Sequence, residues 1–270
     1  MTIQVGISAC LLGERVRYDG DHKRSSFCAD ELSQWVQYVR ICPEVSAGMS
    51  VPRPTIRLEQ HQDRVRAVIP STGADVTDAL IAVADRHQPQ LAALSGYILC
   101  TKSPSCGMER VKLFDPKTNA YERVAQGLFA RRLQQLFPAL PVEEDIRLED
   151  AVLRANFMLR LFIYAGWQRL EQALSAAQLR EFHACVRPLL TAQPQSLAAL
   201  DELTEKAAAM TPALRVNYLE SLMKALSNPA NLPADSSNAL VQLNEYFERY
   251  LPREQAAELA CLIRDFLPVA

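Results

Sequence analysis

Three separated cysteines each follow a short apolar segment, and this placement constrains the possible fold more than any other feature. Residues 3–8 alternate branched apolar side chains and run into Cys10. Residues 38–41 are followed by Cys42, and residues 96–100 are followed by SPSCG, which contains Cys106. Short β-branched segments that run into Gly or Pro are typical of strands that end in loops. The sequence therefore predicts one cysteine just beyond each of three strands.

Helical apolar spacing separates these segments, near residues 29–36, 75–87 and 127–137, and residues 53–70 suit a short hairpin. Strands that alternate with helices predict an α/β fold, with a mostly parallel sheet flanked by helices. The carboxyl ends of parallel strands share one edge of the sheet, where ligands bind in such folds. We therefore expect the three cysteine loops to lie close together.

A second, all-α region is predicted after residue 147. Residues 138–148 are typical of a connector with an acidic run at Glu143, Glu144 and Asp145. From there the chain is rich in Ala, Leu, Glu and Gln with helical apolar spacing, and prolines break it into segments. Since 270 residues exceed the usual size of one core, two domains are expected, residues 1–147 and a smaller helical domain of residues 148–270.

Charge and hydropathy exclude several classes of protein. A net charge of -2 and a pI near 6.1 argue against a broadly basic nucleic-acid surface and favour a small-molecule partner. No apolar run approaches the roughly 20 residues of a membrane span, and the N-terminus lacks the basic start of a secretory signal. Seven irregularly spaced cysteines suit reduced thiols, so we expect a cytoplasmic protein without membrane contact. Nothing in the sequence indicates its oligomeric state.

The spacing of the cysteines alone leaves three interpretations open. Cys10, Cys42 and Cys106 can be buried apolar residues, ligands of an iron-sulfur cluster, or zinc ligands completed by His22 or Glu44. Their shared placement beyond strands favours metal ligation. Cys28, Cys185 and Cys261 stand in helix-like contexts and are expected to be packing residues, whereas Cys100, at the end of an apolar strand, can be either.

Several polar residues stand near these cysteines. Glu44 lies two residues after Cys42, which in an extended segment places both side chains on one face, although a solvated loop residue explains it as well. Ser103 precedes a proline, and its hydroxyl can face a ligand or bond to its own turn. A polar heterocycle could be bound by Arg17, Tyr18 and Asp19, but a simple turn closed by Asp-Gly also accounts for them.

Four motifs occur in order along the chain: ISACLLGERVRYDG, CPEVSAGMSVPRPTIRL, GYILCTKSPSCG and GLFARRLQQLFPALPVEE. They resemble the thiouracil desulfurase (TudS-like) family over roughly the first 170 residues. The resemblance implies a 4Fe-4S cluster held by Cys10, Cys42 and Cys106, with one iron left free for the substrate sulfur. It also implies that Glu44 is the catalytic acidic residue and Ser103 the catalytic serine.

The resemblance predicts an enzyme that converts a thiolated pyrimidine, such as 2- or 4-thiouracil or its nucleoside or nucleotide, into the oxo base and sulfide. The open iron would act as a Lewis acid and water would attack the carbon. The alternatives are a non-catalytic cluster- or zinc-binding redox or interaction protein, and a desulfurase that acts on thiolated RNA. Relatives commonly carry lysine where this chain has Cys100, and the helical region resembles a shortened YbgA-like domain.

Overall fold

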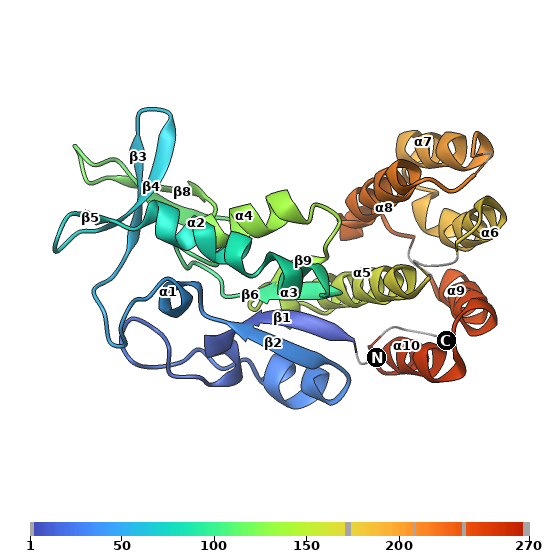
Figure 1. Cartoon of the computed structure of the whole chain (residues 1–270), viewed down its shortest axis with the longest axis horizontal. Helices are drawn as coiled ribbons and strands as arrows, with labels where there is room; N and C mark the ends of the chain where they lie inside the picture. Colours follow the sequence, from blue (N-terminus) through green and yellow to red (C-terminus); the bar gives the residue numbers. More distant parts are fainter. Residues whose placement is uncertain (1–2, 171–173, 208, 234–235, 267–270) are drawn as a thin grey trace. The chain divides into compact units, whose positions relative to one another are not determined.

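The computed structural model describes residues 3–170, 174–207, 209–233 and 236–266, which form two compact units (Figure 1). The first consists of residues 4–138 and 142–149, and the second mainly of residues 150–270. The first unit contains both sheets, and the second is helical. The assignment of separate domains at residues 1–147 and 148–270 stays a prediction.

The first sheet is parallel throughout and carries the cysteine loops. Its strand order is β2-β1-β6-β9. These strands are β2 (Gln37–Ile41), β1 (Gln4–Ser8), β6 (Gly96–Leu99) and β9 (Val142–Glu144). All residues of β6 and β9 are buried, as expected for a parallel sheet covered on both faces. The predicted α/β fold with a parallel sheet flanked by helices is confirmed.

A second sheet of five strands has the order β5-β4-β3-β7-β8, and only part of it was expected. The predicted hairpin is present as an antiparallel pair of β3 and β4, while β3 and β7 pair in parallel. The sequence analysis did not anticipate β7 and β8. The strands are β3 (Arg57–His61), β4 (Arg64–Ile69), β5 (Ala74–Asp75), β7 (Val111–Phe114) and β8 (Tyr121–Ala125).

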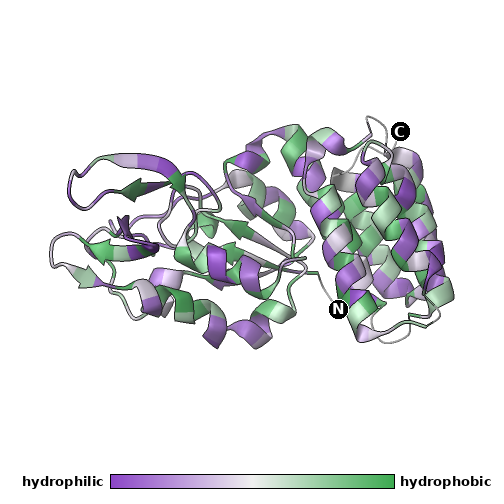
Figure 2. Ribbon diagram, turned by 90° about the horizontal axis from the view of Figure 1, so that it is seen from above, coloured by the Kyte–Doolittle hydropathy of each residue, from purple (hydrophilic) through white to green (hydrophobic). Residues whose placement is uncertain are grey.

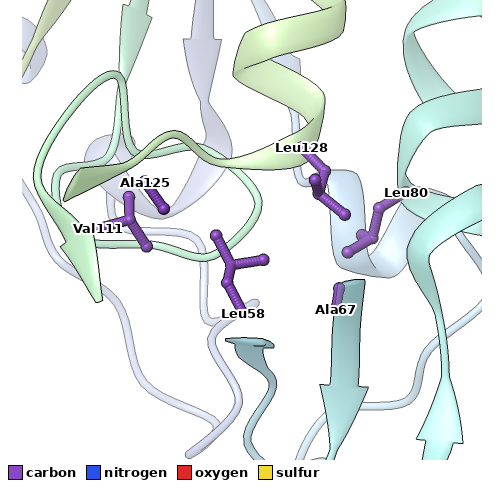
Figure 3. Close-up of a cluster of buried hydrophobic side chains, with 6 residues drawn as sticks. All are labelled: Leu58, Ala67, Leu80, Val111, Ala125 and Leu128. Carbon is purple, nitrogen blue, oxygen red and sulfur yellow. The ribbon is translucent and has the colours of Figure 1, made fainter. Parts of the chain in front are cut away.

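Two helices pack on this second sheet, α2 (Thr77–Arg86) and the start of α4 (Leu128–Leu136). Leu80 of α2 and Leu128 of α4 join buried side chains of the strands in one hydrophobic cluster (Figure 3). The cluster consists of Leu58, Ala67, Leu80, Val111, Ala125 and Leu128. Shorter helices are α1 (Pro43–Ser46) and α3 (Gln88–Ala92), with 3-10 turns at Ala9–Leu12 and Arg147–Glu149.

Two segments differ from the sequence prediction. Residues 29–36 form no regular helix but a π turn (Phe27–Glu31) followed by a 3-10 turn (Leu32–Gln34). Here the side chains of Ser33 and Gln34 donate to the carbonyls of Ala29 and Asp30, at 2.8 and 2.7 Å, and such bonds compete with regular helix geometry. The expected acidic connector contains the buried strand β9, because its carboxylates are satisfied by partners described below.

The second unit contains six α-helices within the described residues. An aromatic cluster joins three of them. The ring of Trp167 stacks on that of Tyr218 with 5.2 Å between the ring centroids, and the centroid of the Phe182 ring lies 5.1 Å from that of Trp167. Hydrophobic and hydrophilic residues alternate around these helices in Figure 2. They are α5 (Ala151–Arg169), α6 (Ala176–Val186), α7 (Pro194–Glu205), α8 (Pro212–Leu226), α9 (Ser237–Tyr250) and α10 (Arg253–Phe266). None of the described helices is both long and apolar enough to cross a membrane.

Candidate active site

A cavity of about 330 Å³ lies at the carboxyl ends of strands β1, β2 and β6. Since these strands are parallel neighbours, the loops that follow them meet at this edge. Of the candidate residues from the sequence, all but Asp19 and His22 line the cavity. The lining candidates are Cys10, Cys42, Cys106, Glu44, Ser103, Arg17 and Tyr18.

Cys10 lies in the 3-10 turn that follows β1. Its carbonyl accepts hydrogen bonds from the backbone of Gly13 at 3.3 Å and of Lys23 at 3.0 Å. Gly13 has φ of 90°, a left-handed conformation that favours glycine, and it ends the turn. These bonds tie the loop of residues 14–26 back to the end of β1 and fix the backbone of Cys10.

Cys42 follows β2 and precedes α1, whose first residue is Pro43. The proline ends the strand because it cannot donate to the ladder, and it suits the first position of a helix. The Cys42 thiol lies 3.7 Å from the carbonyl of Val16 and donates to it. Burial raises the pKa of Cys42, so the thiol needs a partner that favours its charged form before it can ligate a metal.

Cys106 lies in a tight loop that hydrogen bonds to Ser103 hold together. The Ser103 hydroxyl oxygen accepts the backbone N–H groups of Ser105 at 3.2 Å and Cys106 at 3.1 Å. The backbone N–H of Gly107 donates to the Ser103 carbonyl at 2.8 Å. A Cβ on Gly107 would lie 2.9 Å from that carbonyl oxygen, so the loop needs glycine there. Ser103 thus forms the turn expected of a structural serine, and its own O–H remains able to donate.

The first turn of α4 supports this loop from the other side. The N–H groups of Leu128 and Ala130 donate to the carbonyls of Pro104 and Ser105, both at 3.1 Å. A Cβ on Gly127 would lie 2.5 Å from the Ser105 carbonyl oxygen. The glycine therefore permits the close approach that lets free helix N–H groups bind the cysteine loop.

Glu144, the last residue of β9, and Asp145, which follows it, bind the two ends of the loop that carries Cys106. Glu144 accepts from the Thr101 hydroxyl at 2.9 Å and from the backbone of Met108 at 2.7 Å. Asp145 accepts from the backbone of Thr101 at 2.7 Å and forms an ion pair with Lys23 at 2.7 Å. Burial raises the pKa of Glu144. These two carboxylates connect the loops that carry Cys10 and Cys106.

Glu44 projects from α1 into the cavity and is bound on both carboxylate oxygens. Its Oε2 faces Arg53 Nε at 2.7 Å and Nη2 at 2.6 Å, and its Oε1 accepts from the Ser105 hydroxyl at 2.8 Å. The Arg53 side chain is only 5% exposed and also donates to the carbonyl of Val16 at 2.8 Å. A carboxylate oxygen with one such bond keeps a lone pair for a further proton donor. Glu44 is therefore a fixed acceptor at the cavity wall.

The lining of the cavity includes the cationic residues Arg17, Lys23 and Lys102. Arg17 pairs with Asp19 at 3.5 Å, and the Gly20 N–H closes a turn on the Arg17 carbonyl at 3.0 Å. Asp19 thus lies in the turn that the sequence offered as an alternative, outside the lining residues, and its role in binding stays a prediction. The backbone of Lys102 has the left-handed conformation, with φ of 64°.

A fourth thiol and a buried phenol lie beside the three candidate ligands. Cys100 lines the cavity, and its thiol is a hydrogen-bond partner of Cys10. That bond, together with burial, raises the pKa of Cys100, and burial raises the pKa of Cys106. The fully buried hydroxyl of Tyr97 has no hydrogen-bond partner among the described residues. It interacts electrostatically with Cys106, Cys42 and Cys10, which raises the Tyr97 pKa further than burial alone.

The remaining cysteines lie outside the cavity. Cys28 is fully buried, and burial raises its pKa to about 11, as expected for a packing residue. Cys185 and Cys261 belong to helices α6 and α10 of the helical unit. The cavity therefore separates the four cysteines that can meet a shared ligand from the three that cannot.

The donor set suits a cluster of several metal atoms. Within the described parts of the chain, no three His, Cys, Asp or Glu side chains are arranged around a single metal ion. In a cubane cluster each thiolate binds its own iron, so the ligands need not converge on one point. Three thiols from separate loops around one cavity fit such a sulfur-rich group.

Sequence reasoning assigned no role to the residues that position the others, namely Arg53, Ser105, Lys23, Glu144 and Asp145. Arg53 stands within the quoted motif CPEVSAGMSVPRPTIRL, between two prolines, which was the available signal for it. The acidic run at Glu143, Glu144 and Asp145 is predicted from the sequence only as part of a connector.

Comparison with known proteins places the first unit in a family. The model of the 2-thiouracil desulfurase family matches residues 5–145. A solved structure, described as the 4Fe-4S-dependent thiouracil desulfidase TudS, is 27% identical over 55% of this chain and 94% of that chain, with a TM-score of 0.46. No curated protein matches the chain. Because the family match ends at residue 145, the YbgA-like resemblance of the helical region stays a prediction.

Proposed function

The chain belongs to the 2-thiouracil desulfurase family, and on this basis we propose that it replaces the sulfur of a thiolated pyrimidine with oxygen from water. The products are the oxo base and hydrogen sulfide, so no electrons are gained or lost. The observation that carries the proposal is the meeting of Cys10, Cys42, Cys106, Glu44 and Ser103 at one cavity. We place the reaction in the cytoplasm, because thiols stay reduced there.

We assign Cys10, Cys42 and Cys106 as the ligands of a 4Fe-4S cluster. Bound there, such a cluster with one iron free of protein thiolate supplies a soft Lewis acid for the thiocarbonyl sulfur. The chain supplies three thiolates and leaves the remaining side of the cavity to the substrate.

Glu44 accepts the proton of the attacking water in this proposal. Its Oε1 accepts only the Ser105 hydroxyl within the described residues, so one lone pair is left for water. Arg53 holds the carboxylate in one orientation, because two of its nitrogens meet the same oxygen. A general base held in this way needs no side-chain rearrangement before proton transfer.

Ser103 donates its hydroxyl hydrogen to the substrate. Two backbone N–H groups already bond to its oxygen, and donors on the oxygen polarise the O–H. The hydrogen is therefore directed away from the loop, toward a heterocycle nitrogen or the departing sulfur. Arg17 and Tyr18, which line the same cavity, are suited to hold the polar edge of the ring.

A neighbouring basic cavity favours a substrate that carries phosphate. This second cavity, of about 480 Å³, shares Lys102 and Pro104 with the first, and no carboxylate is found among its described lining residues. Arg57, Lys112 and Arg123 also line it. A thiolated nucleotide, or thiolated RNA, could place its base in the first cavity and its phosphate here.

Turnover by the reconstituted enzyme tests the proposal. Anaerobically loaded protein should release sulfide and oxo base in equal amounts from 2- or 4-thiouracil or the corresponding nucleotides. Protein reconstituted with zinc alone should release none. If iron-loaded protein releases no sulfide from the thiolated base, nucleoside, nucleotide or RNA, the proposed activity is refuted and the chain is a cluster-binding protein without it.

The phosphate contact can be tested separately. Lys102→Ala should raise KM for a thiouridine monophosphate roughly 10- to 100-fold, the range expected for one charge-assisted bond, and leave KM for the free base unchanged. Lys117→Ala, outside both cavities, is the control. An equal effect of Lys102→Ala on base and nucleotide would place Lys102 at the ring instead of the phosphate.

A further inference from the structure

The cavity holds one thiol more than the proposed cluster needs. Cys100 directly follows β6, and β6 pairs in parallel with β1, which precedes Cys10. The backbone N–H of Cys100 donates to the Ser8 hydroxyl at 3.0 Å. This bond holds Cys100 against the end of β1, two residues before Cys10.

The two thiols face each other. The Cys100 side chain interacts with that of Cys10, and its thiol also lies 3.8 Å from the carbonyl of Thr101, whereas Cys42 donates to the carbonyl of Val16 and Cys106 interacts with the Ser8 hydroxyl. The register of β1 and β6, with Ile7 opposite Ile98, continues to place Cys100 opposite Ala9, the residue before Cys10. Neighbouring strands lie about 4.8 Å apart, and the Cα atoms of disulfide-linked residues usually lie about 4.4 to 6.8 Å apart. Among the four cavity thiols, this pair is therefore the one prepared to form a disulfide.

We propose that Cys10 and Cys100 form an intramolecular disulfide whenever Cys10 carries no iron, by exchange with a low-molecular-weight disulfide such as glutathione disulfide. The Cys10 thiolate attacks one sulfur of that disulfide, and one thiolate leaves and takes up a proton. Cys100 then loses its proton and attacks the Cys10 sulfur, which releases the second thiol. Two protein thiols are oxidised, and one small disulfide is reduced to two thiols.

The disulfide acts as a lock on cluster assembly. It occupies Cys10, so iron cannot bind there until a reductant restores the thiol. It also shields Cys10 from irreversible oxidation. A disulfide can be reduced back to thiols, whereas oxidation to a sulfinic or sulfonic acid is ordinarily irreversible. This consequence rests on the proposed function, in which Cys10 is a ligand, but the formation of the disulfide does not.

Tryptic mapping tests the disulfide directly, because trypsin separates the cavity cysteines. Cys10 lies in residues 1–15, Cys42 in 41–57, Cys100 in 87–102 and Cys106 in 103–110. Iron-free, reduced full-length protein is incubated with glutathione disulfide and digested without reduction. We expect residues 1–15 linked to 87–102, and the loss of two thiols per chain. A stable glutathione adduct on Cys10, or a link from residues 1–15 to 41–57 or 103–110, contradicts the proposal.

Two variants sharpen the result. Cys100→Ser should retain glutathione on Cys10, because the one thiol proposed to displace it is gone and Cys42 and Cys106 are not placed to do so. Cys185→Ser, in the helical unit, should give the same cross-link as the wild type. If Cys100→Ser loses glutathione from Cys10 as fast as the wild type does, another group displaces the glutathione, and the proposal is contradicted.

Iron uptake separates the lock from the proposed function. Cross-linked protein should take up no cluster until dithiothreitol is added, whereas reduced protein takes it up at once. If cross-linked protein takes up a full cluster with the bond intact, the lock is refuted. If reduced wild-type protein takes up no iron, the proposed function fails, while the mapped cross-link still stands or falls by itself.

Discussion

The Glu44 carboxylate lies in the cavity but is not assigned as a ligand, so its contribution can be separated from cluster binding. Glu44→Gln removes the proton acceptor, and Ser103→Ala removes the hydroxyl donor. Each should keep normal iron content and lose roughly a hundred- to ten-thousand-fold in the rate of sulfide release, the usual contribution of a positioned acid-base group. Rates are compared at equal iron occupancy and saturating substrate.

Glu122→Gln, on the exposed part of β8, is the matched control for Glu44→Gln. If both site variants turn over at the wild-type rate, Glu44 and Ser103 are only loop structure. Loss of iron in Glu44→Gln alone would make Glu44 a displaceable ligand instead of the base.

Arg53 is a positioning residue in this account. Arg53→Lys keeps the charge but cannot present two nitrogens to Oε2 of Glu44 while donating to the Val16 carbonyl. We expect kcat to fall about tenfold or more with KM little changed, because misplacement of the base weakens only the transition state. A change in KM alone would assign Arg53 to substrate binding.

At this scale the sequence predicted residues that meet at the cavity but not those that hold them there. Cys10, Cys42 and Cys106 were found because strand ends in a parallel sheet share an edge. Arg53 was missed because its side chain reaches Glu44 across an irregular loop, whose path no local pattern predicts.

Among the elements, β9 is the one that couples the cysteine loops to the sheet. Glu144→Ala removes the acceptor of the Thr101 hydroxyl and the Met108 N–H, and each lost bond to a buried partner costs about 1–3 kcal/mol. The variant should unfold at a lower temperature and lose iron to a chelator faster than wild type. Glu122→Ala is the control, and equal rates of iron loss in the two variants would contradict the role of β9.

The elements show where sequence periodicity suffices and where it does not. β1, β2, β6, the β3–β4 hairpin, α2 and α4 carry clear local patterns and are present as expected. The sequence predicts a connector where β9 lies, because charged residues are rarely buried. The partners Thr101 and Met108 of Glu144 and Arg147 of Glu143 make the burial of β9 favourable. Strands β7 and β8 lie between turns and are partly exposed, which weakens their periodic signal.

For the whole molecule, the helical unit has an acid-sensitive anchor of its own. Asp201 accepts hydrogen bonds from Arg187 at 3.0 Å and faces His183 Nε2 at 2.8 Å, and these bonds lower the pKa of Asp201 to about 2. A carboxyl whose pKa is lower in the folded state stabilises that state above its unfolded pKa of about 3.9, and this stabilisation is lost toward pH 2.

Asp201→Asn should therefore lower the unfolding temperature of the full chain, followed by far-UV circular dichroism, at pH 6. The difference from wild type should shrink between about pH 4 and pH 2 as Asp201 becomes protonated. A difference that stays constant over this range would show that the charge of Asp201 is not what stabilises the helices.

The iron content of the cysteine variants tests the central claim most directly. Wild type, Cys28→Ala, Cys185→Ala and Cys261→Ala should each hold about four irons per chain after anaerobic reconstitution, as expected of a cubane cluster. Cys10→Ala, Cys42→Ala and Cys106→Ala should each fail to retain the cluster, because each removes one of only three protein thiolates. Cys100→Ala should retain it. A full cluster in any of the three ligand variants, or a lost cluster in Cys100→Ala, would contradict a cluster held by three thiolates with one iron open to substrate.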